Sequence, residues 1–560
     1  MSYRGGVPTD HAVRGLTLRA GHRLVLAVAS GLVLVLAFPT YDHFWLAPVA
    51  VALLSAAVLG ASWRVASGSG LVAGLAFFLP TLSWSGVYVG ALPWVALCVL
   101  QALYIAVMAG VTAAVQRPLL GTRLQPLAYA AVPLFWVLQE TARSHTPFGG
   151  FPWARLAFSQ ADSPLAPLAA YVGAPGVTAA VAALGALLHA TVVVALGRIR
   201  RPAAGRRSTV PGSLTAPAVS LALVLLAVVP AVAALAATPP TGGRGVPVMF
   251  VQGNVPRAGL DFNAERRQVL DNHVQQTLRG LAAGEGEAPS LVVWPENASD
   301  IDPLRNADAE AAIRSAVEAA GVPVLVGAVL REPAPMLSNA SLLYRPGGGQ
   351  PERYVKQHPV PFAEYIPYRS FFRTFSDKVD LVTADFTGGE DPAAFEVPVA
   401  SGGSYSAIPT ICFEVAYDDL MREATLAPGR GDSLLVVQTN NATFGYTAES
   451  EQQFAISRLR AIEHGRSVVH VSTVGVSAFI RPDGSYEDKT RLFTGVAAHG
   501  EPVVRSSLTV SDRIGDLPEY TAAALAALLV TAAAATSRAR GRRAARVQAE
   551  HREEEEAVVV

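Results

Sequence analysis

Long apolar stretches and stretches of mixed polarity divide this chain into two kinds of sequence. Residues 1–240 and 517–537 hold long apolar runs, whereas residues 245–512 alternate short apolar runs with polar and charged positions. A helix needs about 20 apolar residues to cross the hydrocarbon core of a bilayer. The pattern therefore predicts a membrane part that is interrupted by a globular domain.

Eight apolar runs come close to that length. They cover residues 24–40, 45–61, 69–87, 92–114, 126–142, 168–196, 214–237 and 518–536. A cleaved signal peptide would explain the first run alone, but the runs that follow favour a retained span. We expect a seven-helix membrane domain over 24–240 and a final span at 518–536, between an N-terminal segment 1–23 and a tail 537–560.

Arginines in the short loops predict how these spans are oriented. Arginine-rich and arginine-poor loops alternate along the chain, and the arginine-poor loops hold only Arg143 and Arg155. The arginine-rich side includes Arg14, Arg64, Arg117, Arg200 and Arg540. Basic loops accumulate on the cytoplasmic side of a membrane. We therefore expect a plasma-membrane protein with both termini in the cytoplasm and residues 245–512 outside.

The globular stretch has the pattern of an α/β domain. Six short apolar runs rich in β-branched residues suit buried strands: Val248–Gln252, Leu291–Pro295, Val322–Val329, Ala407–Cys412, Leu434–Thr439 and Val468–Thr473. Helix-like stretches lie between some of them, at Ala264–Ala283 and Asp308–Ala320. Polar residues gather just after several of the runs, where sites of α/β sheets usually form.

Composition narrows the classes of function. The chain has 560 residues, of which 51% are hydrophobic and 16% charged, and its formal net charge is zero. A neutral, apolar chain has no electrostatic footprint for nucleic acid. Its two cysteines, Cys98 and Cys412, form no disulfide framework, and Cys98 lies in an apolar run that suits a buried thiol. The histidines have no metal-like spacing, so we expect neither a metal nor a cofactor.

Three residues that follow apolar runs carry the candidate chemistry. Lys356 is one of only three lysines among 44 basic residues, and a lysine where arginine is the rule suggests a need for a compact cation. Glu296 ends the sequence Trp-Pro-Glu, and Cys412 begins Cys-Phe-Glu. A carboxylate can take the thiol proton, and a nearby cation can favour the thiolate and stabilise an oxyanion. Together they predict nucleophilic catalysis.

Each of these residues also has an ordinary structural explanation. A glutamate after a strand is usually a helix cap or a surface residue, a buried cysteine is usually core, and a lysine is usually solvated. The prediction rests on the three types occurring together. Glu364 and Glu414 are further carboxylates near Lys356 and Cys412. They could orient the lysine, shuttle protons, or simply form salt bridges.

These motifs resemble a known family. Trp-Pro-Glu at 294–296, the Lys356 segment and Cys-Phe-Glu at 412–414 resemble the Glu-Lys-Cys triad of the nitrilase superfamily. Seven spans before this domain and one after it are similar to bacterial apolipoprotein N-acyltransferases. Val-Gln-Gly-Asn at 251–254 and Gly-Phe-Pro-Trp at 150–153 match the family as well.

The resemblance implies a fold and an activity. The fold would be an extracytoplasmic α-β-β-α sandwich on a polytopic helical membrane domain. The activity would be transfer of an acyl chain from a phospholipid donor to the α-amino group of a diacylglyceryl-cysteine apolipoprotein. The resemblance makes Glu296 the general base, Lys356 the oxyanion-stabilising cation and Cys412 the acyl-accepting nucleophile. We expect the protein to act as a monomer.

The resemblance also suggests supporting residues, and the chain departs from the family pattern in places. The supporting residues are Glu364, Glu414, Asn339, Trp153, Gly150, Phe262 and Phe444. The family commonly has Asn-Asp-Ala-Trp-Phe-Gly after the cysteine strand, where this chain has Asn441 and Thr443 in place of Asp and Trp. Phe262 stands where a tryptophan is common. These changes leave the triad intact but put in doubt how lipid-facing loops hold substrate.

Two other functions stay open from the sequence. A membrane-anchored amidase would share the triad but would need water at the thioester. A transporter or scaffold would be favoured by a charged residue inside a span, for which Glu140 is the main candidate. The aromatic residues between Phe362 and Phe375, with Arg369 and Arg373 among them, predict a segment at the membrane interface. A core-packing loop is the alternative.

Overall fold

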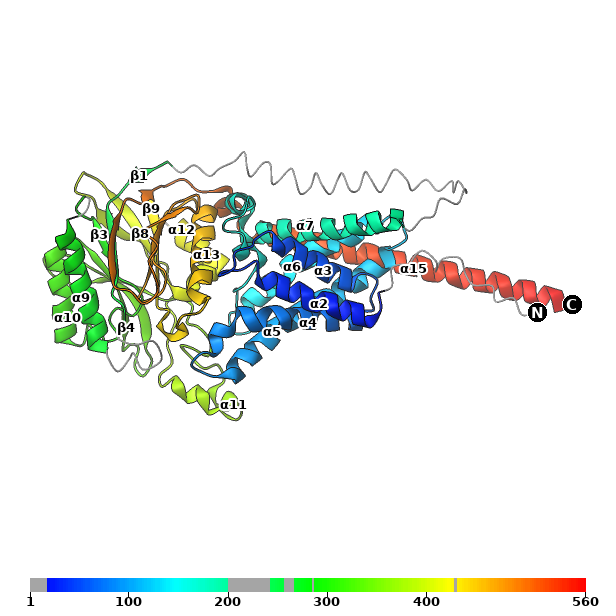
Figure 1. Ribbon diagram of the computed structural model, residues 1–560, viewed down its shortest axis with the longest axis horizontal. Coiled ribbons are helices and arrows are strands. Elements are labelled where there is room, and N and C mark those ends of the chain that lie inside the picture. Colours follow the sequence, from blue (N-terminus) through cyan, green and yellow to red (C-terminus); the bar gives the residue numbers. More distant parts are fainter. Residues whose placement is uncertain (1–17, 200–241, 256–265, 285–286, 428–430, 560) are drawn as a thin grey trace.

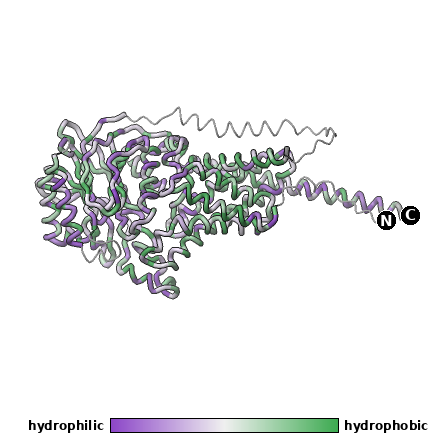
Figure 2. Tube along the Cα trace, in the orientation of Figure 1, coloured by the Kyte–Doolittle hydropathy of each residue, from purple (hydrophilic) through white to green (hydrophobic). Residues whose placement is uncertain are grey.

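A helical bundle and a two-sheet domain lie end to end in the computed structural model (Figure 1). The structure describes residues 18–199, 242–255, 266–284, 287–427 and 431–559. The bundle is mostly hydrophobic and the sheet domain is mixed, as Figure 2 shows. The expected span at 214–237 and the candidate Phe262 lie outside the described residues.

Seven described helices make up the bundle, and each overlaps an apolar run of the sequence. They are α2 (Ala20–Val35), α3 (Leu46–Val58), α4 (Trp63–Thr81), α5 (Ala91–Leu119), α6 (Gln125–His145), α7 (Ala169–Ile199) and α15 (Leu517–Val559). Among the described residues, three segments are long and apolar enough to cross a membrane: Ala91–Leu119, Ala166–Leu196 and Leu517–Glu554. Helices α2 and α3 are shorter and apolar.

Small residues let neighbouring helices of the bundle approach closely. A Cβ added at Gly74 of α4 would lie 2.8 Å from the Cα of Ala102 in α5. A Cβ added at Gly70 would likewise lie 2.6 Å from the carbonyl oxygen of Ile105 in α5. Such small-residue contacts are typical of helix pairs in membranes. One helix, α15, also continues far past the run at 518–536, so the expected tail at 537–560 is its helical extension (Figure 1).

Two six-stranded sheets form the centre of the other domain. One sheet has the order β13 (Val496–Gly500), β2 (Val248–Gln252), β3 (Leu291–Val293), β4 (Val324–Leu330), β5 (Ser338–Tyr344), β6 (Glu352–Val355). The other has the order β12 (Tyr486–Glu487), β11 (Ala478–Ile480), β10 (Val468–Ser472), β9 (Ser433–Thr439), β8 (Ser404–Ile411), β7 (Phe395–Pro398). In each sheet three central strands are parallel. The six strands expected from the sequence are all present.

The two sheets pack face to face and are covered by helices on both outer faces. Side chains such as Phe250 and Val293 of one sheet share an apolar core with Val436 and Val469 of the other. Helices α9 (Arg266–Ala283) and α10 (Ala307–Ala320) cover the face away from the bundle (Figure 1). Helices α12 (Asp418–Leu426) and α13 (Glu449–His464) lie between the sheets and the bundle. This is the expected α-β-β-α sandwich.

The helix α13 joins the sandwich to the bundle. Its apolar residues Leu459 and Ile462 belong to one continuous core with Val437 of β9 and with Val177 of α7. All of its residues except Glu451 and Arg458 are buried. The sandwich therefore rests on the bundle through a helix that has almost no exposed face.

Candidate functional site

Glu296, Lys356 and Cys412 come together at the strand ends. Glu296 follows β3, Lys356 follows β6, and Cys412 follows β8. The Lys356 Nζ lies 3.4 Å from Glu296 Oε1, and Cys412 hydrogen-bonds to the Glu296 carboxylate. Glu296 and Lys356 are 5% and 1% exposed, while Cys412 is half-buried. The carboxylate and the cation are thus shielded from water, and Cys412 is the most exposed residue of the three.

Cys412 occupies a sharp turn between a strand and a short helix. Its φ of 55° lies in the left-handed region, which costs free energy for any residue with a Cβ and is often found at functional sites. The 3-10 helix η6 (Cys412–Ala416) starts at this residue. The turn lifts the thiol away from the β8 ladder and presents it at the edge of the sheet.

Asn339 and Glu364 hold the lysine and the base in place. Glu364 accepts a hydrogen bond from Lys356 Nζ at 2.9 Å. The amide of Asn339 donates to Glu296 Oε1 at 2.6 Å and lies 3.3 Å from Glu364 Oε1. Lys356 therefore sits between two carboxylates that are themselves tied together by an amide.

Glu414 lies close to this cluster but has different partners. Its carboxylate accepts hydrogen bonds from the hydroxyl of Tyr354 at 2.9 Å and from the backbone N–H groups of Gln357 at 2.6 Å and Ile411 at 2.7 Å. These bonds tie the end of β6, which carries Lys356, to the end of β8. The sequence left open whether Glu414 orients the lysine, shuttles protons or forms a salt bridge. These contacts favour orientation, because Glu414 binds the backbone N–H of Gln357, the residue after Lys356.

Burial, with the neighbouring charges, raises the pKa of the Cys412 thiol above its ordinary value. Burial raises the pKa of Cys412, the Glu296 carboxylate raises it further, and Lys356 offsets only part of this effect. Burial also raises the pKa of Glu296, against the pull of Lys356. Burial alone would lower the pKa of Lys356, but Glu364 and Glu296 outweigh it and raise that pKa well above its ordinary value. Lys356 thus acts in the expected direction, toward the thiolate, but burial and Glu296 outweigh its effect on the pKa of Cys412.

The loop at 145–160 lies next to the turn at Cys412. Trp153 is fully buried, and its ring stacks on Phe413 with a centroid distance of 5.1 Å and an interplanar angle of 7°. Gly150 has a φ of 85°, and a Cβ there would lie 2.1 Å from the backbone of Ser144. Because Phe413 follows Cys412 in the chain, this loop of the bundle supports the turn that carries the thiol.

Phe444 occupies a neighbouring place at the same junction. Its ring lies 5.1 Å from that of Trp84, edge to face. The indole N–H groups of Trp84 and Trp153 both donate to Oε1 of Gln452 in α13, at 3.1 and 2.8 Å. The sequence did not single out Gln452 or its neighbour Gln453, whose amide lies 3.7 Å from Cys412 Sγ. Two adjacent glutamines in a buried helix were the available signal.

Glu140, the candidate for a transport residue, is fully engaged in structural contacts. It accepts hydrogen bonds from the indole of Trp136 at 3.1 Å, the backbone of Leu156 at 2.9 Å and the hydroxyl of Thr178 at 2.7 Å. It also lies 3.7 Å from Arg155. A carboxylate with these partners fastens α6 to the 145–160 loop and to α7, so it no longer favours a transporter.

Comparison with known proteins places the chain in a family. Residues 30–187 match the apolipoprotein N-acyltransferase N-terminal domain, and residues 251–497 match the carbon-nitrogen hydrolase domain. An apolipoprotein N-acyltransferase of Mycolicibacterium smegmatis is 37% identical over 88% of this chain and 82% of that protein. The chain belongs to the apolipoprotein N-acyltransferase family.

A further relative and a solved structure are also similar to the chain. An apolipoprotein N-acyltransferase of Ralstonia nicotianae is 31% identical over 90% of this chain and 92% of that protein. A crystal structure of an amidase from Nesterenkonia sp. is 16% identical and covers 49% of this chain and 96% of its own, with a TM-score of 0.33. As a member of this membrane-associated family, the protein is an acyltransferase with a nitrilase-like domain.

Proposed function

We propose that this protein transfers an acyl chain from a phospholipid to the α-amino group of a lipoprotein's N-terminal diacylglyceryl-cysteine. The observation that carries the proposal is the meeting of Glu296, Lys356 and Cys412 at one shielded site, in a chain 37% identical to a transferase of that name. The acceptor and donor are both held by the bilayer, and the apolar bundle lies beside the site.

The reaction has two halves, and Cys412 is a free thiol at the beginning of the first half and at the end of the second. In the first, Cys412 Sγ attacks the ester carbonyl while its proton passes to Glu296, and Lys356 stabilises the oxyanion. Glu296 then returns the proton to the leaving alkoxide of the lysophospholipid, and a thioester remains. In the second half, the amine attacks the thioester, Glu296 accepts the amine proton, and the thiol is restored. Because the thiol in the first half and the amine in the second must each give up a proton, both halves depend on Glu296.

The thioester provides the decisive test. Purified protein given phospholipid without acceptor should carry an acyl group on Cys412, detected by mass spectrometry of the peptide. Cys412→Ser should form no thioester, and Glu296→Gln and Lys356→Arg should slow its formation roughly a hundredfold or more. Cys98→Ala is the matched control, because Cys98 is buried in α5 and donates to the Phe78 carbonyl. Absence of acyl-Cys412 in the wild type would refute covalent transfer.

Discharge of that thioester separates the transferase from an amidase. A peptide with an N-terminal diacylglyceryl-cysteine should take the acyl group on its amine. Release of free fatty acid at the same rate with and without this peptide would instead favour the amidase.

We also infer eight spans, with the sandwich outside the membrane and both termini inside. The support is the alternation of arginine-rich loops and the overlap of seven described helices with seven of the apolar runs. A cysteine introduced at Asp308, at the exposed start of α10, should react with an impermeant thiol reagent on intact spheroplasts. One introduced at Arg123, in the α5–α6 loop, should react only after lysis. Equal labelling of both before lysis would contradict the topology.

The aromatic segment after Lys356 is the proposed path for the lipid. Its helix α11 (Arg369–Arg373) lies beside the catalytic-domain end of α5 (Figure 1). Tyr368, Phe371 and Phe375 are 73%, 57% and 67% exposed, which a core-packing loop would not show. Exposed aromatic residues next to arginines are typical of a membrane interface.

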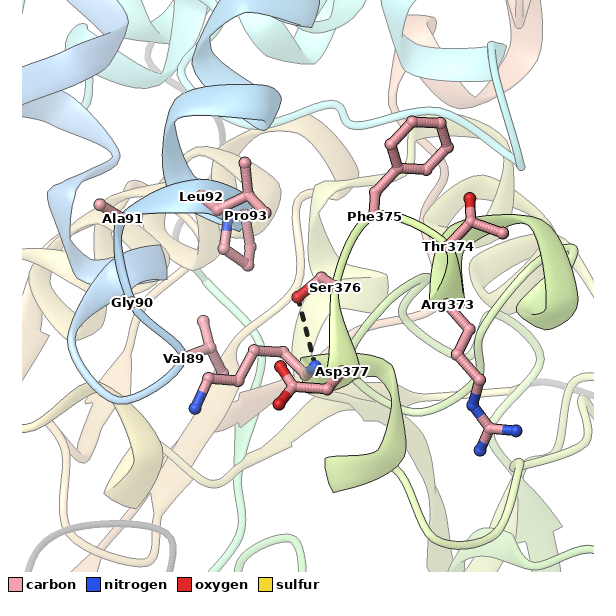
Figure 3. A pocket seen from close by; sticks show the side chains of 11 residues that line it. Val89, Gly90, Ala91, Leu92, Pro93, Arg373, Thr374, Phe375, Ser376 and Asp377 are labelled. Carbon is pink, nitrogen blue, oxygen red and sulfur yellow. Dashed lines mark hydrogen bonds between the residues drawn. The ribbon is translucent and has the colours of Figure 1, made fainter.

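An open cleft of about 520 Å³ separates this segment from the start of α5 (Figure 3). Residues 89–93 line one side and residues 373–378 the other. In Figure 3 the ring of Phe375 and the guanidinium of Arg373 point to opposite sides of the segment. The exposed apolar stripe of α5 begins at this cleft with Leu92 and continues through Leu103 and Val107. A lipid that lies along α5 would thus reach the cleft at the start of that helix.

Replacing Phe371 and Phe375 by serine tests this path. Thioester formation from bilayer phospholipid should slow, while alkylation of Cys412 by a small soluble reagent should stay unchanged. If both reactions fall together, the segment holds up the fold and does not deliver lipid.

A further inference from the structure

A chain of hydrogen bonds that includes neither Glu296 nor Lys356 also reaches Cys412. The backbone N–H of Gly475 donates to Ser472 Oγ at 2.7 Å, and the Ser472 hydroxyl donates to Asn441 Oδ1 at 2.5 Å. Asn441 Nδ2 donates to Gln453 Oε1 at 3.0 Å. Gln453 Nε2 then lies 3.7 Å from Cys412 Sγ.

The hydrogen bonds of this chain all run in one direction. The backbone N–H of Gly475 can only donate, so Ser472 accepts from it, and the Ser472 hydroxyl in turn donates to Asn441. Asn441 therefore presents its oxygen to Ser472 and its NH₂ group to Gln453. The hydroxyl of Thr439 donates to the same Gln453 oxygen at 2.7 Å. With two donors on its oxygen, Gln453 has to turn its N–H toward the sulfur.

Burial makes this arrangement hard to replace by water. Gln453, Ser472 and Thr439 are fully buried, and Asn441 is 2% exposed. A buried amide without its partners costs free energy, so the network favours one arrangement over its alternatives. The hydrogen bonds between Gly475 and Cys412 therefore keep one arrangement.

The chain also accounts for the asparagine that departs from the family pattern. Asn441 Nδ2 donates to the buried carboxylate of Glu449 at 2.6 Å, in addition to Gln453. An aspartate at 441 would place two carboxylates in contact. It would also accept from Gln453 and so turn the N–H of that residue away from Cys412. Asn441, Glu449 and Gln453 are therefore mutually compatible.

We propose that Gln453 is a further catalytic residue, which donates a hydrogen bond to the sulfur of Cys412, and that Asn441 is the positioning residue that fixes this donation. The sulfur gains negative charge when its proton passes to Glu296, and again when the thiolate leaves in the second half of the reaction. A hydrogen bond to a charged acceptor is stronger than one to a neutral acceptor. The identity of the reaction rests on the proposed function, whereas the hydrogen bond to the sulfur does not.

Three charged or titratable groups act on the sulfur from the elements around it: Glu296 after β3, Lys356 after β6 and Glu449 at the start of α13. The test therefore leaves all three in place and changes only the amide chain. Alkylation of Cys412 by iodoacetamide is measured as a function of pH. Peptide mass spectrometry reads Cys412 separately from Cys98.

Removing the donor should make the thiol less acidic. Gln453→Met keeps a similar side-chain size without an N–H, so the midpoint of alkylation should move to higher pH. At neutral pH the rate should fall roughly three- to tenfold, because less of the thiol is ionised and the higher nucleophilicity of a less acidic thiolate offsets only part of that loss. Asn441→Asp, which does not touch the sulfur, should move the midpoint in the same direction by turning Gln453 around.

The neighbouring glutamine is the matched control. Gln452→Met also removes a buried amide from α13, but that amide binds Trp84, Trp153 and the carbonyl of Thr81. Its alkylation midpoint should equal that of the wild type even if its melting temperature falls. The proposal is overturned if Gln453→Met and Asn441→Asp leave the midpoint in place, or if Gln452→Met moves it equally.

This test is independent of acyl transfer, because alkylation needs neither lipid nor acceptor. A protein with the expected alkylation profiles but no acyl-Cys412 would refute the proposed function alone. A protein that forms acyl-Cys412 but shows no effect of Gln453→Met would refute the role of Gln453 alone.

Discussion

The two outer helices α10 and α13 cover opposite faces of the same sandwich but are built on different rules. Helix α10 buries only Ala309, Ile313, Ala316 and Val317, one stripe at helical spacing, and turns its other residues to solvent. It begins at Asn306, whose side chain caps the backbone N–H of Ala309, and ends at a left-handed glycine. Its sequence alone specifies a surface helix.

Helix α13 is buried on nearly every side, although its sequence is rich in polar residues. Its polar side chains therefore need partners, and they find them in the bundle and at the site. Arg460 donates to the carbonyl of Val415 at 2.8 Å and to Asp418 at 2.6 Å, and Glu463 accepts from the backbone of Ala174 at 3.0 Å. A polar helix between two domains thus carries both their attachment and part of the chemistry.

The largest expected effect comes from the buried arginine of α13. Arg460→Met would remove an ion-pair partner from both Asp418 and Glu463. Removing one partner of a buried ion pair lowers the free energy of unfolding by about 3–5 kcal/mol. The matched change on α10 is Arg314→Met, whose partner Glu310 lies at the surface, so its effect should stay under about 1 kcal/mol. Thermal unfolding of the purified protein in detergent measures both. Equal losses of melting temperature would mean that the two helices are held alike.

A pH-dependent effect should separate the first turns of the two helices. Burial raises the pKa of Glu449 to about 8 from an ordinary 4.5, because the folded protein disfavours its charge. The stability that depends on the protonated form is complete below pH 4.5 and is lost as the pH rises toward 8.

Glu449→Gln keeps an acceptor for Asn441 without the charge. It should match the wild type near pH 4.5 and exceed its stability at pH 8 by about 2–4 kcal/mol. Melting temperatures measured across this range would show the two curves diverging. Glu310→Gln on the exposed side of α10 is the control and should give no such divergence, while parallel curves for Glu449→Gln would contradict the prediction.

The smallest of these effects belongs to Gln452. Gln452→Met leaves the indole N–H groups of Trp84 and Trp153 without their shared acceptor, at a cost of about 1–3 kcal/mol. Its counterpart on α10 is Ser315→Ala, at an exposed position, which should change stability by less than about 0.5 kcal/mol. Tryptophan emission, recorded with the melting curve, should shift for Gln452→Met only. No shift would mean that the rings are held by stacking alone.

Local signals made the sheets and the triad predictable. Six strands are short β-branched runs that the sequence predicted, and Glu296, Lys356 and Cys412 lie within three residues of a strand end, so their position depends on local structure. Gln453 and the role of Asn441 were not predicted, because their meeting depends on how α13 packs against β9. Glu414 was predicted near the lysine, yet its bonds to backbone N–H groups depend on the paths of two distant strand ends.

The C-terminal extension teaches a different lesson. Residues 537–560 were expected to be a tail after the last span, and α15 continues through this stretch as one helix as far as Val559. Alanine, arginine and glutamate, the main residues of this stretch, are strong helix formers. The signal was therefore present in the composition, and the high charge of the segment masked it.

The stacking of Phe413 on Trp153 fixes how far Cys412 lies from the helical bundle. Phe413 is the residue after the nucleophile, and Trp153 belongs to the loop between two helices of the bundle. Rocking of the sandwich on its base would have to separate these rings before the sulfur could rise or sink. In the proposed orientation, the thiol would stay at one distance from the bilayer midplane. It would therefore react only with carbonyl groups that lie at that distance. The protein would then select the ester linkages near the glycerol and pass over groups that lie further along the acyl chains.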